Sequence, residues 1–479
     1  MNERDVIRIE GRERVFDRRR ILFVLLLAMG MSLMAVSSVN VALATIEDGL
    51  GASASDLQWV LSGYALAFGI ALIPAGRAGD VLGRGSLFVA GMAIFVVASL
   101  FCGLATAPWA LNAARLAQGL GAGLYSPQVT GMIQQYFTGG GRARAFALLG
   151  LVVSASVAVG PVLAGTIIQF VGSHDGWRWT FFTYIPVGLV GIALALAWFP
   201  FETERRLRGA DRPRVDLDPV GTLLMGAAVL GSMYPFMART PWAWALLPVA
   251  AGTTWAWVRW ERRYAARGGE PLVDLALFGY RSYRNGIIVS GGVFLGVTST
   301  FVVVALFLQT GLGTGALIAG LIGLPNALAS AFASVYTVRF VMANGRRLII
   351  GALVIALTST LSAIVVAWLI ETAGLSFWWL AAPLGLMGLG MGTFMSANQT
   401  MSMQDVPGTH GGTAGGLKQT VERIATAMGN AVITSVFFLV ASWGDWVHAF
   451  MAAFAAISVC LAVALGLGIL DERQHRRPA

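Results

Sequence analysis

The sequence predicts an all-α integral membrane protein with 14 transmembrane helices, built as two six-helix bundles plus a central inserted helix pair. Composition is the first reason, since 57% of the 479 residues are hydrophobic and only 12% are charged, against about 25% charged in soluble domains. The second is the recurrence of apolar runs long enough to cross about 30 Å of hydrocarbon. The third is the concentration of arginine in alternate loops.

The net charge of +9 does not by itself indicate nucleic acid, because basic residues in polytopic proteins mostly mark cytoplasmic loops. Cys102 and Cys460 both fall inside apolar runs and provide neither a disulfide framework nor metal-ligand spacing. We therefore expect no nucleic-acid partner, no metal and no cofactor.

Residues 1–20 form a basic N-terminal segment, and an apolar run begins at Ile21. Ala42, Leu43 and Ala44 resemble a signal-peptide cleavage site. The run is nevertheless long enough to span a membrane and many more spans follow, so we interpret it as an uncleaved first helix.

Fourteen apolar runs qualify as spans, of which the fourth and the thirteenth are the least apolar. In order along the chain they are 21–45, 57–78, 86–106, 109–136, 144–171, 180–201, 219–237, 241–260, 285–310, 315–340, 347–370, 376–402, 413–441 and 446–470.

The basic residues orient these spans. With the N-terminus in the cytoplasm, 28 of the 33 Arg and Lys residues lie inside and only Arg178 and Arg239 lie outside. The other three, Arg115, Lys418 and Arg423, lie within predicted spans. This asymmetry predicts a multi-pass protein of the cell membrane with both termini in the cytoplasm.

The two longest loops divide the chain. The predicted segments are an N-terminal segment 1–20, a six-helix bundle 21–201, a linker 202–218, a two-helix insert 219–260, a linker 261–284, a second six-helix bundle 285–470 and a cytoplasmic tail 471–479.

The stretch GRAGDVLGRG lies in the loop after the second span. Gly76 and Gly83 permit a tight turn between two helices. The Asp80 carboxylate suits a helix N-terminus or an ion pair with Arg84. An ordinary basic cytoplasmic hairpin explains the same residues equally well.

Two further motifs lie within spans. Arg115 is costly at membrane depth, so we expect it to face the bundle interior beside Gln118. It acts either as a clamp on backbone carbonyls or as a proton or substrate relay. In the fifth span, Gly160, Pro161 and Gly165 permit close packing and a bend.

These motifs, with ARLAQGLGAG, VGPVLAG and DGWRWTFFTYIPVG, resemble the major facilitator superfamily and its fourteen-span drug:proton antiporter branch. SVNVALATI, DLQWVLSGYALAFG and EPLVDLALF also match that branch, so the resemblance covers most of the chain. It implies alternating access and efflux of small molecules in exchange for protons. It also implies that the loop carrying Asp80 docks on the cytoplasmic end of span 13, and that Gly160, Pro161 and Gly165 shape an efflux-directed cycle.

Three positions depart from the branch. Ala35 stands where the first span usually carries an acid, Ala44 replaces a proline, and Tyr184 replaces an asparagine. Because a coupled exporter needs a group that gains and loses a proton, coupling must rest on Glu422, the one acid within a predicted span, or on the rim acid Asp56.

Span 13 concentrates polar residues. Lys418, the only lysine in the chain, is four residues before Glu422, and Gln419 is four residues before Arg423, so each pair shares a helix face. Three interpretations remain open. Asp80 and the start of span 13 form an inner gate with Lys418 and Arg423 as partners, or Glu422 binds substrate or proton, or the charges form a passive cluster.

Asn398 and Gln399 in span 12 either line a cavity or form interhelical hydrogen bonds.

Taken together, these features predict a monomeric secondary transporter, working by alternating access, that exports amphipathic or cationic small molecules in exchange for protons. An importer or uniporter on the same fold is the alternative. We find no His-Glu-x-x-His motif and no large soluble domain, so an enzyme or receptor is not expected.

Overall fold

The computed structural model describes residues 6–8, 15–172, 174–201, 216–238, 240–314 and 316–476. The rest of the predicted N-terminal segment, residues 202–215 of the first linker and the last three residues of the tail lie outside this described part. Apart from a two-stranded hairpin of β1 (Val6–Arg8) and β2 (Val15–Asp17), the regular structure of the described residues is helical.

The chain divides into two compact units. Unit 1 comprises residues 1–138, 159–279 and 406–420, and unit 2 comprises residues 139–158, 280–405 and 421–479. Two long helices, α5 (Gly139–Val171) and α15 (Gly411–Ala441), contribute one part to each unit.

The remaining helices of unit 1 come mostly from the first half of the chain. They are α1 (Arg18–Leu50), α2 (Ala54–Leu82), α3 (Arg84–Leu104), α4 (Pro108–Tyr136), α6 (Gly176–Phe182), α7 (Tyr184–Trp198), α9 (Pro219–Ala238), η2 (Pro241–Ala245), α10 (Leu246–Ala266), η3 (Leu275–Gly279) and η6 (Gly408–His410).

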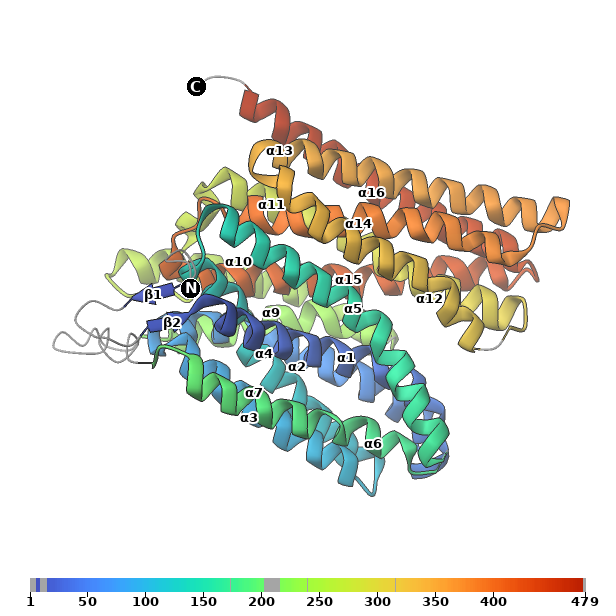
Figure 1. Cartoon of the computed structure of the whole chain (residues 1–479), viewed down its shortest axis with the longest axis horizontal. Helices are drawn as coiled ribbons and strands as arrows, with labels where there is room; N and C mark the ends of the chain where they lie inside the picture. The colour runs from blue at the N-terminus through green and yellow to red at the C-terminus, as the bar shows by residue number, and fades with distance from the viewer. Residues whose placement is uncertain are drawn as a thin grey trace. The chain divides into compact units, whose positions relative to one another are not determined.

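Unit 2 holds α11 (Arg281–Val297), α12 (Ser299–Leu306), η4 (Phe307–Gly311), α13 (Ala316–Ala373), η5 (Phe377–Leu380), α14 (Ala381–Ser402) and α16 (Trp446–Arg476). Within this unit α13, α14 and α16 pack alongside one another (Figure 1). The 58-residue α13 is two helices joined at Asn344, whose φ of −135° is not helical.

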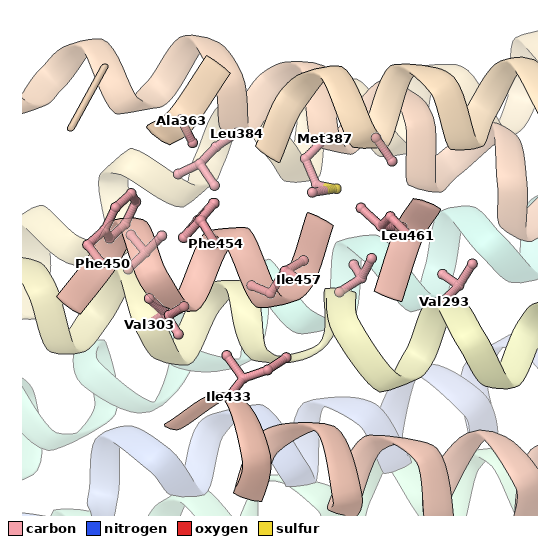
Figure 2. Packing of buried hydrophobic residues seen from close by; sticks show 14 of the residues in the cluster. Val293, Val303, Ala363, Leu384, Met387, Ile433, Phe450, Phe454, Ile457 and Leu461 are labelled. Carbon is pink, nitrogen blue, oxygen red and sulfur yellow. The ribbon is translucent and has the colours of Figure 1, made fainter. Parts of the chain in front are cut away.

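The core of unit 2 is formed by side chains from several helices. Figure 2 shows Phe450, Phe454, Ile457 and Leu461 of α16 packed among Leu384 and Met387 of α14, Val293 of α11 and Val303 of α12. Because lipid is as apolar as these side chains, close van der Waals packing rather than escape from water holds such helices together.

Eleven helices of the described part are long and apolar enough to cross a membrane, fewer than the fourteen predicted. Two predicted spans form helices that are not among the eleven, namely α4 and α10. The predicted spans 315–340 and 347–370 run together through the bend at Asn344 and count as one candidate, Gly320–Ala373.

Candidate functional site

A buried ionic cluster in unit 1 joins the end of α2 to the start of α15. The side chains of Asp80 and Arg84 are 3% and 6% exposed, and Arg84 Nη2 lies 2.6 Å from Asp80 Oδ1. The backbone N–H groups of Gly412 and Thr413 donate to the Asp80 carboxylate over 3.1 and 2.8 Å, and the Thr413 hydroxyl donates over 2.8 Å. Asp80 therefore caps the N-terminus of α15, where its charge also complements the helix dipole.

Arg84 extends this cluster to two further elements. It donates to the Gly131 carbonyl and the Gln135 side chain of α4, both over 2.8 Å, and to the Gly408 carbonyl of η6 over 2.6 Å. One guanidinium thus holds α4, η6 and the Asp80 carboxylate together, as a planar five-donor group allows.

The two predicted glycines permit this approach. A β-carbon on Gly76 would overlap the Gly412 carbonyl oxygen, so α2 and the start of α15 are in direct backbone contact. Gly83 has φ +105°, which a residue with a side chain rarely adopts, and it forms the turn between α2 and α3.

In the part of α15 that belongs to unit 2, Glu422 is half-buried and its Oε1 accepts a hydrogen bond of 2.6 Å from Ser290 Oγ of α11. Arg423 is also half-buried, whereas Lys418, in the unit 1 part of the helix, is only 3% exposed. The sequence did not identify Ser290, because a lone serine in an apolar run carries no signal of its partner.

Arg115 and Gln118 belong to a separate network in unit 1. Arg115 is 1% exposed and donates to the Val60 carbonyl over 2.9 Å and to Gln118 Oε1 over 2.5 Å. Gln118 in turn donates to Ser99 Oγ over 2.7 Å, and the Tyr64 ring lies 4.4 Å beneath the guanidinium. These contacts fit the expectation of an inward-facing arginine and favour the clamp over the relay.

The rim acid Asp56 takes part in a capping box at the start of α2. Its Oδ2 accepts from the Ser53 N–H and hydroxyl over 3.0 and 2.7 Å, while its own N–H donates back to Ser53 Oγ. Helix capping accounts fully for an acid at this position.

The antiporter-like stretch of α5 packs on α1 within unit 1. A β-carbon on Gly160 would overlap Ser37 Oγ and lie 3.2 Å from the Met34 carbonyl, whereas one on Gly165 would have only an ordinary contact. Pro161 lies inside the helix. Gly160 thus sets the spacing of the two helices.

Two of the departures from the antiporter branch, Ala35 and Tyr184, have described surroundings. Ala35 is fully buried, so an acid there would need a partner. Tyr184 of α7 forms a hydrogen bond of 2.7 Å with Ser38 of α1.

The two polar residues predicted in span 12 lie in α14 of unit 2. Asn398 donates to the Gly286 carbonyl over 3.3 Å, and Gln399 at the next position is half-buried.

Each unit has a hollow among its described residues. One of about 690 Å³ in unit 1 is lined by apolar residues of α3 and α4, including Ile94, Val97, Phe101 and Trp109, which are largely exposed. An open hollow with so apolar a lining lacks the polar groups that fix a solute in a binding site. The other, of about 20 Å³, includes Asn398, Arg346 and Asp471 and holds no more than a water molecule.

Among the described residues, Glu371, Asp445 and His448 of unit 2 place one ligand atom each within 4.8 Å of one another. His448 Nδ1 already lies 2.5 Å from Asp445 Oδ2, and the His448 N–H donates to Asp445 Oδ1. Capping of the start of α16 by Asp445 explains the contact between Asp445 and His448.

The sequence is similar to known proteins over most of its length. Residues 25–430 match the Major Facilitator Superfamily. The chain is 31% identical over 423 residues to a probable actinorhodin transporter of Streptomyces coelicolor, covering 87% of this chain and 72% of that one. It is 28% identical over 437 residues to a methylenomycin A resistance protein of Bacillus subtilis, covering 88% of each.

The fold agrees with solved transporters. The human organic anion transporter MFSD10 superposes with a TM-score of 0.69 at 15% identity, over 94% of this chain and 99% of that one. A proton:xylose symporter, XylE, superposes with a TM-score of 0.62. The chain belongs to the Major Facilitator Superfamily.

Proposed function

We propose that the chain is a proton-coupled exporter of small amphipathic or cationic molecules. It is a membrane transporter and not an enzyme, as its family and fold establish. The observation that carries the direction of transport is its similarity, over nearly its whole length, to proteins named for export of or resistance to antibiotics. Antibiotics of this kind are small organic molecules, which sets the substrate class.

In this proposal the chain forms fourteen spans, with α4 and α10 crossing the membrane and α13 crossing twice about Asn344. The domains are the predicted six-helix bundles 21–201 and 285–470 and the insert 219–260. A monomer with both termini in the cytoplasm is sufficient for alternating access between two such bundles.

The Asp80 cluster is the proposed inner gate. The capping contacts with the start of α15 support this role, since a capping carboxylate can leave a helix end and be replaced by water. Glu422 is the proposed proton carrier. Half-burial and the hydrogen bond from Ser290 suit a carboxyl group that changes protonation within the membrane.

An importer or uniporter is the second candidate. The observation that favours it is Ala35, which leaves the first span without the acid common in the antiporter branch. Uptake and export assays separate the two candidates.

The test is an accumulation assay in a bacterial host lacking its own efflux pumps, using ethidium and a panel of amphipathic antibiotics. Cells expressing the chain should accumulate less of at least one compound, and an uncoupler should abolish the difference. Equal accumulation with and without the chain across the panel would contradict export, and higher accumulation would favour import.

A further inference from the structure

Two carboxylates are buried together in unit 1 where the inserted helices α9 and α10 meet. Asp218 immediately precedes α9 and is 0% exposed, while Glu261 lies near the end of α10 and is 1% exposed. Both positions fall at the ends of the predicted linkers 202–218 and 261–284. Carboxylates are rarely this buried unless they are paired or protonated.

Asp218 has a full set of donors. The Gly221 N–H donates to its Oδ1 over 2.9 Å, which makes Asp218 the N-cap of α9 ahead of Pro219. Trp260 Nε1 donates to both carboxylate oxygens over 2.9 and 3.1 Å. Asp218 also has φ +40°, a strained conformation for a residue with a side chain.

The carboxylate of Glu261 lacks hydrogen-bond donors of this kind among the described residues. A β-carbon on Gly221 would overlap Asp218 Oδ2 and lie 3.0 Å from Glu261 Oε1, so the two carboxylates approach the same side of this glycine. Trp257 and the N–H groups of Leu272 and Val273 face Glu261. Neither of its oxygens accepts a hydrogen bond of normal geometry from the described residues.

The other charged groups nearby are occupied with one another. Arg77 of α2 pairs with Glu270 over 2.5 Å and also contacts the Asp216 carbonyl. The Asp216 carboxylate accepts from the Tyr264 hydroxyl over 2.8 Å and from the Glu270 N–H over 3.1 Å. Arg77 is therefore engaged beside the pair and not within it.

We propose that Asp218 and Glu261 form a proton-binding site at the base of the inserted helix pair, with the proton held on Glu261. Proton binding removes the repulsion between the two carboxylates and lets the end of α10 stay packed against the cap of α9. The site is separate from Glu422, and it senses the cytoplasm if the proposed orientation holds.

Burial, followed by the charge of Asp218, raises the pKa of Glu261 from 4.5 to about 7. The folded state then holds this proton more tightly than the unfolded state does. The free energy of unfolding should therefore fall as the pH rises from about 4.5, and the loss should be complete above about 7.

Infrared titration of the purified protein in detergent, between about pH 5 and pH 9, tests the proposal. A component of the carbonyl band of protonated carboxyl groups should disappear with a midpoint near 7 in the wild type, and this component should be missing in Glu261→Gln. The matched control Glu47→Gln, at an exposed position, should keep the band. A band of wild-type size and midpoint in Glu261→Gln would overturn the proposal.

A second variant keeps the test independent of whether Glu261→Gln folds. Asp218→Asn preserves a capping group but removes the neighbouring charge, so the midpoint of the same band should move to lower pH. An unchanged midpoint in Asp218→Asn would mean that the two carboxylates do not interact. Neither titration depends on transport or on orientation, so each can fail while the proposed export holds.

Discussion

At the residue scale, Asp80 combines an ion pair with Arg84 and the capping of α15. Both roles need the negative charge. The ion pair satisfies a buried guanidinium, and the cap satisfies two backbone N–H groups that have no partner within their own helix. Loss of the charge should therefore affect both the stability of the protein and the proposed inner gate.

We expect Asp80→Asn to lower the free energy of unfolding by about 3 kcal/mol, because it leaves the buried Arg84 without its anion. Thermal unfolding of the purified variant in detergent measures this effect. Asp405→Asn, the same change at an exposed carboxylate, should unfold like the wild type. Equal stability of the two variants would show that the ion pair is not a structural contact.

At the element scale, α2 and the start of α15 meet without side chains between their backbones. Gly76 makes this contact possible, since a β-carbon there would overlap the Gly412 carbonyl. The cap by Asp80 requires the same spacing, because hydrogen bonds of about 3 Å fail when two helices separate by even 1 Å.

Gly76→Ala should force these helices apart and cost about 1–3 kcal/mol, as overpacking does. Export of ethidium from cells should fall with it, because the proposed gate can no longer close around Asp80. Gly351→Ala is the matched control, since a β-carbon at this position of α13 meets nothing within 4 Å. If both alanine variants unfold and transport alike, close packing at Gly76 is not needed.

The sequence predicted the helices better than their contacts. Apolar length alone located most spans, including both parts of α13, because the hydrocarbon thickness fixes that length. The predicted break between spans 315–340 and 347–370 agrees with the division of α13 into two helices at Asn344, because Asn344, Gly345 and Arg346 interrupt the apolar run. The motif around Asp80 directed attention, through the family resemblance, to the residues that form the buried cluster with the start of α15.

Pairings between distant residues were beyond the sequence. Ser290 is 132 positions from Glu422, and packing of α11 on α15 alone brings them together. Asp218 and Glu261 were assigned to linkers because they flank the insert. The sequence does carry a signal for Asp218, which directly precedes Pro219 and an apolar run. This pattern is typical of a helix N-cap.

At the scale of the whole molecule, fourteen spans require that α4 and α10 cross the membrane although they are not among the eleven apolar candidates. Both carry features that lower hydropathy without preventing a span. In α4 the polar side chains are mostly buried, including Arg115, Gln118, Gln128 and Gln134. In α10 the charges lie toward its end, from Arg259 onward.

Reporter fusions test this topology. A fluorescent protein, which is active only in the cytoplasm, should fluoresce when fused after Gly140, after Gly268 or at the C-terminus. Alkaline phosphatase, which is active only outside, should be active when fused after Thr240 or Trp443. Phosphatase activity from a fusion after Gly268 would mean that α10 does not cross, and the C-terminal fusion would then report the opposite side.

The claim on which the whole account rests is that Glu422 couples export to protons. Proteoliposomes containing the purified protein, given an imposed pH gradient and ethidium, test it directly. The wild type and the exposed control Glu47→Gln should accumulate ethidium against its gradient, whereas Glu422→Gln should retain only downhill movement. Gradient-driven accumulation at the wild-type level in Glu422→Gln would contradict the account.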